Sequence, residues 1–250
     1  MSDFVQLFNE RLQEIEAYLD LLAALEQQVQ QGPPSIGRTG PVITVQQQKI
    51  LYSSVYLQLY NLVESTVSRC IEAFSNAVIE RGPWYPSDLS TNLRREWVRC
   101  TARTHTELNY ENRLAAAFEL CEHLVQSLPI STFRIEKGGG GNWDDNSIQD
   151  ISSRLGLVLR INQDIYRSIK RPFRNDQGSL VFIKNLRNEL AHGSLSFAEC
   201  GEGVTVSDLR ELKERTASYL NEVVQFFQKS IDDYEFLLPD RRPSHPSISA

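Results

Sequence analysis

A short segment near residue 190 carries four polar side chains that could act on a phosphodiester. It reads FIKNLRNELAHG, residues 182–193, and contains Lys184, Arg187, Asn188 and His192. A histidine can give or take a proton near neutral pH, and an arginine keeps its positive charge. An arginine, an amide and a histidine together therefore suit general acid–base chemistry beside a phosphate group.

The spacing of these residues predicts that they share one side of a helix. At about 100° per residue, Lys184, Asn188 and His192 fall within about 80° of one another, and Arg187 lies about 60° to the other side of Lys184. The apolar residues of the segment fall opposite them: Ile183, Leu186 and Leu190. We therefore expect Arg187 and His192 to leave the helix away from its apolar face.

The following glycine predicts where this helix ends. Gly193 suits the left-handed conformation that closes many helices, so we expect a helix over about 178–192 with His192 in its last turn. The carbonyl end of a helix favours a positively charged imidazole. A histidine placed there suits proton exchange with a phosphodiester.

The overall composition is that of a globular protein with a substantial core. Hydrophobic residues make up 41% and charged residues 23% of the 250 residues. No apolar run is long enough for a membrane span, and the N-terminus lacks the pattern of a secretory signal. The cysteines contain no Cys-x-x-Cys pair, and the histidines have no ligand-like spacing. We expect a cytoplasmic location, no membrane association, no metal and no cofactor.

The net charge of −6 is unlike that of a generic nucleic-acid binder, which is usually basic. Contact with a nucleic acid would have to use a local patch. Basic residues gather between residues 154 and 174, and they could follow a phosphate backbone. The alternative is an ordinary solvated helix face. We take Arg167, Arg171 and Lys184 as candidate substrate-binding residues.

Apolar residues recur at helical spacing along most of the chain, which predicts an all-α fold. The expected helices cover about 3–30, 44–80, 88–104, 107–127, 147–157, 178–192 and 208–236. Together they predict one domain over residues 1–238, a helical bundle with long antiparallel helices and decorated loops. The tail 239–250 is expected to be disordered.

Local signals refine several of these boundaries. Thr44 and Gln47 fit a capping box before the second helix. Ser147 and Ser207 are expected to cap two later helices, over about 147–157 and 208–236. The turn-rich segment 196–207 could hold two short strands.

Glu64 lies within NLVES, in the most apolar of the expected helices. A carboxylate in such a helix could point into a cleft beside the polar segment, so we take Glu64 as a fourth candidate substrate-binding residue. The alternative is an acid at a helix end or on the surface, and the sequence does not separate the two.

Several separated segments resemble one known family. LRNELAHG resembles the signature of the HEPN superfamily, in which four to six residues separate an Arg from a His and a polar residue directly follows the Arg. KNLRNELAHGSLSFAECG further resembles the cyanobacterial-type MAE-like HEPN branch. Three more segments are similar to that branch: YLQLYNLVESTV at 56–67, GGGGNWDDNSIQDISSRLGL at 138–157 and TVSDLRELKERTASYLNEVVQFF at 205–227.

The resemblance implies an all-α bundle that dimerises and cleaves RNA without a metal. Arg187 and His192 occupy the two motif positions, and Asn188 the polar position. The implied reaction is attack of an RNA 2′-hydroxyl on the neighbouring phosphorus, with His192 exchanging the proton and Arg187 stabilising the extra negative charge. The implied role is that of a toxin or antiviral defence effector, with an antitoxin or another defence protein as partner.

The sequence departs from one family pattern and leaves two alternatives open. Some HEPN toxins carry, two residues after the His, a Tyr that a partner modifies; here that position is Ser194. One alternative is a non-catalytic HEPN module that binds RNA or protein. The other is an acidic helical partner or immunity protein.

Overall fold

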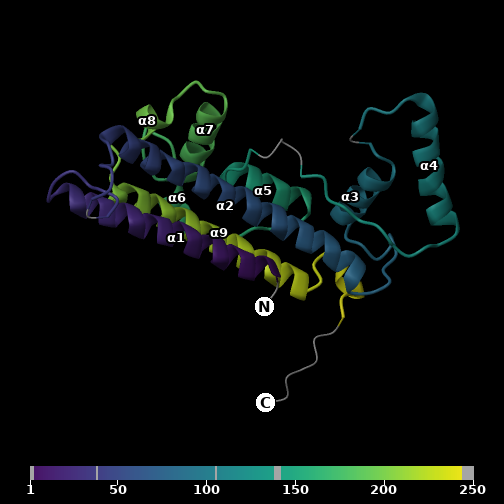
Figure 1. The fold of residues 1–250 in the computed structure, drawn as a ribbon. Coiled ribbons are helices and arrows are strands. Elements are labelled where there is room, and N and C mark those ends of the chain that lie inside the picture. The colour runs from purple at the N-terminus through teal and green to yellow at the C-terminus, as the bar shows by residue number, and fades with distance from the viewer. Residues whose placement is uncertain (1–2, 38, 105, 138–141, 244–250) are drawn as a thin grey trace, which may run out of the picture. The chain divides into compact units, whose positions relative to one another are not determined.

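The computed structural model describes residues 3–37, 39–104, 106–137 and 142–243. These residues form helices, loops and a few isolated β-bridges, and they contain no strand (Figure 1). The all-α prediction is confirmed. The four consecutive glycines at 138–141 lie outside the described residues.

The helices are α1 (Asp3–Val29), α2 (Val45–Glu80), α3 (Thr91–Thr101), α4 (Tyr110–Val125), α5 (Asp145–Arg154), α6 (Gln163–Lys170), α7 (Ser179–Ala191), α8 (Phe197–Cys200), α9 (Val206–Asp232) and the 3₁₀ helix η2 (Pro239–Arg241). No helix within the described ranges is long and apolar enough to cross a membrane. The expected disordered tail begins with η2, and its remainder from residue 244 lies outside the described part of the chain.

The chain folds into two compact units, each built from separate segments. The first unit contains Met1–Val67, Asn142–Asp145 and Ile161–Val223. The second contains Ser68–Gly141, Asn146–Arg160 and Val224–Ala250. Both α2 and α9 contribute residues to each unit. A single cooperative domain over residues 1–238 stays a prediction.

In the first unit, α1 runs antiparallel to α2. The Tyr18 hydroxyl, late in α1, donates to the Leu51 carbonyl at 3.0 Å near the start of α2. Arg11, earlier in α1, reaches Asn61 further along α2 at 3.4 Å. The two helices therefore pack with opposite directions.

The helix α9 also runs antiparallel to α1. Near its start, the Val206 N–H donates to Glu26 at 3.3 Å, and Arg210 donates to Asp20 at 2.6 Å. Within this unit α2 and α9 are therefore parallel to each other. The expected antiparallel packing applies to α1 against both of them.

The capping box predicted for α2 is confirmed. The Gln47 N–H donates to the Thr44 hydroxyl at 3.2 Å, and the Thr44 N–H donates to the Gln47 side chain at 2.8 Å. Two other predicted caps are wrong. The helix α5 begins at Asp145, so Ser147 lies inside it, and an acidic residue in the first turn suits the helix dipole.

The second incorrect cap is Ser207, because α9 begins one residue earlier. The Asp208 N–H donates to the Thr205 hydroxyl at 3.2 Å, and the Asp208 carboxylate accepts from the Thr205 N–H at 3.0 Å. The predicted strands over 196–207 are also wrong. A capping box between Ser196 and Glu199 starts the short helix α8 there.

The second unit has an aromatic core. The ring of Phe74 on α2 meets Phe227 on α9 and Phe236 just beyond it, with ring centroids 6.1 and 6.0 Å apart. On α4 only Ala116 is buried, and His123 packs on Trp97 of α3 at 5.0 Å. Most large apolar side chains of α4 are exposed: Tyr110, Leu114, Phe118, Leu124 and Val125.

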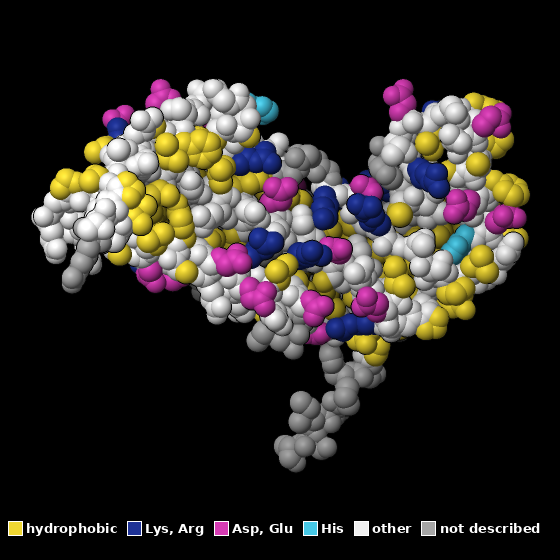
Figure 2. All heavy atoms as spheres, in the orientation of Figure 1, with side chains coloured by type: hydrophobic (Ala, Val, Ile, Leu, Met, Phe, Trp, Pro, Cys, Tyr) yellow, Lys and Arg dark blue, Asp and Glu magenta, His cyan; other side chains and the backbone are white. Residues whose placement is uncertain are grey.

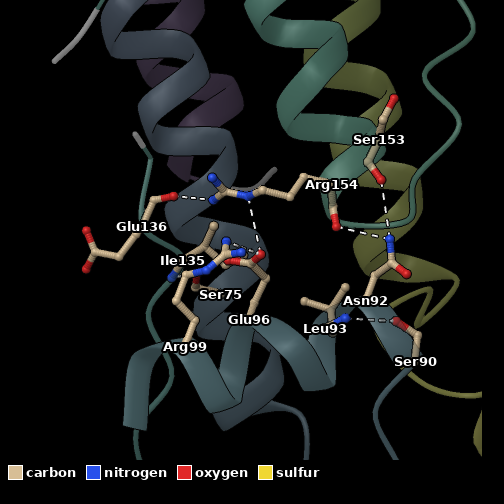
Figure 3. Close-up of polar contacts among 10 residues, drawn as sticks. All are labelled: Ser75, Ser90, Asn92, Leu93, Glu96, Arg99, Ile135, Glu136, Ser153 and Arg154. Atoms are coloured by element: carbon tan, nitrogen blue, oxygen red, sulfur yellow. Dashed lines mark hydrogen bonds and ion pairs between the residues drawn. The ribbon is translucent and has the colours of Figure 1, made fainter. Parts of the chain in front are cut away.

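A buried carboxylate, Glu96 on α3, joins three segments of this second unit (Figure 3). Its side chain is only 2% exposed. Its Oε1 accepts from Arg99 Nη1 at 2.6 Å and lies 3.3 Å from Arg154 Nε on α5. Arg154 also donates to the backbone carbonyl of Glu136. Burial lowers the pKa of the Arg154 guanidinium, and the nearby Glu96 charge offsets part of this shift.

Replacing Glu96 by leucine is expected to lower the free energy of unfolding by about 2–3 kcal/mol, because it leaves two partly buried guanidinium groups without their acid. Urea unfolding followed by circular dichroism measures this loss. The matched control is Glu119→Leu, since Glu119 is exposed on α4. Equal stability of the two variants would contradict a structural role for Glu96.

Candidate active site on α7

The helix α7 carries the polar segment and lies in the first unit. It covers Ser179–Ala191, with Gly178 as N-cap and His192 as C-cap, and Gly193 has a φ of +70°. The predicted helix and its end at Gly193 are confirmed. At the other end, a Cβ on Gly178 would lie 2.7 Å from the Ile169 carbonyl oxygen, so a glycine is needed where α6 and α7 approach closely.

Apolar side chains fix the orientation of α7 in the first unit. Phe182, Ile183 and Leu190 are buried, while Leu186 is half-buried. The Phe182 ring meets the edge of the Tyr56 ring on α2, with centroids 5.7 Å apart. This packing turns the neighbouring residues of α7 toward α2.

Arg187 lies against α2 and is held there by three groups. Its guanidinium carbon lies 4.6 Å from the centre of the Tyr60 ring, a cation–π contact. Its Nη1 donates to the Asn188 side-chain oxygen at 2.9 Å. Its Nη2 lies 3.9 Å from Glu64 Oε2. The expected exit of Arg187 away from the packed face is therefore wrong, because its side chain, 30% exposed, covers the aromatic ring of a neighbouring helix.

Tyr60 lies one helical turn before Glu64 on α2, so both reach the same guanidinium. The Tyr60 hydroxyl accepts a hydrogen bond from the Trp143 backbone N–H at 3.4 Å. Burial raises the pKa of Tyr60, which keeps the hydroxyl neutral. Tyr60 thus offers Arg187 an uncharged ring in a fixed place.

Asn188 links Arg187 to a segment far away in the sequence. Its side-chain oxygen accepts from Arg187, and its Nδ2 donates to the Asn142 side-chain oxygen at 3.2 Å. Its position directly after the arginine thus lets it bind the guanidinium from the side.

Two lysines of this unit hold two consecutive aspartates. Lys184 on α7 lies 2.5 Å from Asp144, and Lys170 on α6 forms an ion pair with Asp145. Burial alone would lower the pKa of Lys170, but its hydrogen bond with Asp145 raises it above the ordinary value. Lys184, a candidate substrate-binding residue, is thus already paired with Asp144 within the same unit.

His192 is exposed at the end of α7. Its backbone N–H donates to the Asn188 carbonyl at 3.0 Å, and within the described ranges its imidazole has no hydrogen bond or ion pair. The ring is therefore open to a solvent-borne substrate. No hydrogen bond joins it to Arg187 among the described residues.

The other candidate residues differ in their relation to Arg187. Glu64 lies beside it, but its side chain is 41% exposed, and a substrate-binding role for Glu64 stays a prediction. Arg167 and Arg171 on α6 and its C-cap are exposed and pair with Asp164 at 3.4 Å and Glu211 at 3.0 Å. On the face drawn in Figure 2, basic side chains are interspersed with acidic ones. A substrate-binding role for these arginines stays a prediction.

The sequence analysis missed Tyr60 and Asn142. Tyr60 could have been found, because it lies four residues before Glu64 and therefore on the same helix face. No local signal pairs Asn142 with α7, since 46 residues separate it from Asn188. Within the described residues, no three His, Cys, Asp or Glu side chains lie together as metal ligands.

Comparison with known proteins identifies a family. A family model described as HEPN_MAE_28990-like HEPN matches residues 2–236. No curated protein matches the chain. No solved structure matches it either. The match extends over most of both compact units and includes α2, α7 and α9. The chain therefore belongs to this HEPN family.

Proposed function

We propose that this HEPN protein is a metal-independent endoribonuclease. The observation that supports this most is the placement of Arg187 on α7, the helix that ends in the exposed His192. Its guanidinium is held by Tyr60, Asn188 and Glu64. A fixed positive charge stabilises a developing negative charge without having to reorganise during the reaction. An exposed imidazole on the same helix can supply the proton transfer.

The reaction begins with the RNA 2′-hydroxyl. Its oxygen attacks the adjacent phosphorus while its proton passes to an imidazole. The bond from phosphorus to the 5′-oxygen breaks, and that oxygen takes a proton from a second imidazole. The products are a 2′,3′-cyclic phosphate and a 5′-hydroxyl. Arg187 would stabilise the extra negative charge on the phosphoryl oxygens.

A single His192 cannot serve both sides of an in-line displacement. We propose that two copies pair about a two-fold axis and bring both α7 segments to one cleft, so that one His192 takes the proton and the other gives it. Lys184, Arg167 and Arg171 would contact the RNA backbone. Glu64 would hold Arg187 and limit its reach.

We expect sedimentation velocity at micromolar concentration to show a homodimer. Activity should fall with dilution more steeply than in proportion to protein concentration, because the monomer holds half of the proton-transfer machinery. The comparison is cleavage rate against dimer fraction over the same dilution series. A monomer with full activity would exclude the shared site.

The direct test of the activity uses an end-labelled single-stranded RNA in EDTA. We expect cleavage in the presence of the chelator, with 2′,3′-cyclic phosphate and 5′-hydroxyl ends. Loss of activity in EDTA, or products with 3′-hydroxyl ends, would refute the mechanism. The cellular role that we propose is that of a toxin or antiviral defence effector, in which an antitoxin or another defence protein restrains the nuclease.

A second candidate is a non-catalytic module that binds RNA or protein. The Glu64 carboxylate at 3.9 Å from Arg187 favours it, since an acid beside the guanidinium reduces the charge offered to a phosphate. RNA binding without cleavage in the same assay would support this candidate. In that case Glu64→Gln should tighten binding.

A further inference from the structure

Four consecutive residues of the first unit, Asn142–Asp145, form an arm, and each of the four contacts a helix of the same unit. Asn142 accepts from Asn188 at 3.2 Å, and the Trp143 N–H donates to the Tyr60 hydroxyl at 3.4 Å. Asp144 and Asp145 pair with a lysine of α7 and a lysine of α6. The Trp143 side chain is buried. The arm is thus attached to α2, α6 and α7.

The first two residues of this arm contact two of the three groups that hold Arg187. Trp143 bonds to Tyr60, whose ring lies under the guanidinium, and Asn142 bonds to Asn188, whose oxygen accepts from it. Arg187 is therefore supported on two sides by groups that the arm itself fixes.

The chemistry of the two amides makes Asn142 decisive. An arginine only donates hydrogen bonds, so Asn188 must turn its oxygen toward Arg187. Its NH₂ group then points to the other side and requires an acceptor. The Asn142 oxygen is that acceptor. Without it, the contact with Arg187 alone holds the Asn188 side chain, so the amide can turn away from the guanidinium.

We propose that Asn142 is a positioning residue: it anchors the far side of the Asn188 amide and thereby holds the Arg187 guanidinium in place. This inference rests on the proposed ribonuclease function for its kinetic consequences. Its geometric part concerns Arg187 alone and can be measured without a substrate.

Two substitutions separate positioning from general structure. Asn142→Leu removes the acceptor at similar size, whereas Asn142→Asp keeps an oxygen that accepts from Asn188. Asn142 is exposed, so neither change should unfold the protein. The matched control is Asn185→Leu, since Asn185 is another amide of α7 and bonds to Gln177 at 3.2 Å.

We expect Asn142→Leu to lower kcat about tenfold or more, toward the hundredfold loss that a 1 Å misplacement can cause. Asn142→Asp should keep kcat near the wild-type value and raise KM for RNA, because it adds a negative charge near the phosphate. Asn185→Leu should keep both. A merely structural role would not give this separation of kcat from KM.

The substrate-free measurement is the NMR signal of the Arg187 side-chain N–H, assigned by its loss in Arg187→Lys. We expect it to shift or broaden in Asn142→Leu and to stay near its wild-type position in Asn142→Asp. If the wild type cleaves no RNA, the proposed function fails while this signal still decides the positioning role. An unchanged Arg187 signal in Asn142→Leu would overturn the inference, whatever the activity.

Discussion

Replacing His192 by alanine is expected to lower the rate of RNA cleavage by about 10²–10⁴-fold, because the variant loses the group that exchanges the proton. The stability should stay within about 0.5 kcal/mol of the wild type, as for other exposed side chains. The His192 imidazole has no intramolecular partner in the described part of the chain, and its backbone cap to Asn188 remains in the variant.

The measurement is single-turnover cleavage of a labelled RNA in EDTA, with urea unfolding of the same samples. Ser194→Ala is the matched control, since Ser194 is exposed two residues further on. Among the described residues its hydroxyl bonds only to the Glu189 carbonyl, at 3.1 Å. This control should cleave at the wild-type rate. A His192→Ala variant that cleaves as fast as the control would remove the imidazole from the mechanism.

The parts of the fold that local chemistry decides could be predicted. The end of α7 follows from Gly193, which adopts the left-handed conformation that closes a helix, and the start of α2 follows from a reciprocal capping box. The helix α9 begins two residues before the predicted start at 208. Thr205 and Asp208 cap each other there, and a serine between them drew the prediction.

The parts that depend on distant neighbours could not be predicted. The helical wheel predicts that Arg187 leaves α7 away from its apolar face, and only the tertiary packing shows that α2 offers it the ring of Tyr60. The contact of Asn188 with Asn142 depends on a chain return that no periodicity encodes. Likewise, the apolar residues of α4 predicted a helix but not that Tyr110, Phe118 and their neighbours would be exposed.

Replacing Arg187 by alanine is expected to lower the cleavage rate by about 10²–10³-fold, the range found when one preorganised donor is removed from a charged transition state. The protein should also lose about 1 kcal/mol of stability, because the guanidinium packs over Tyr60 and lies beside Glu64. Urea unfolding therefore has to accompany the kinetic assay.

Two further variants separate the chemical effect from the packing effect. Arg187→Lys keeps the charge but lacks the planar fork that can bind Asn188 and a phosphate together, so it should recover little activity. Tyr60→Leu keeps the guanidinium charge but removes the ring beneath it. Because Tyr60 is buried, this variant should lose more stability than Arg187→Ala. It should lose less activity, because Asn188 still holds the guanidinium. If Tyr60→Leu and Arg187→Ala lose activity equally, Arg187 acts through packing.

If Arg187→Ala and His192→Ala both keep full activity, the segment from Lys184 to His192 is only a polar helix face, and the nuclease proposal fails with it.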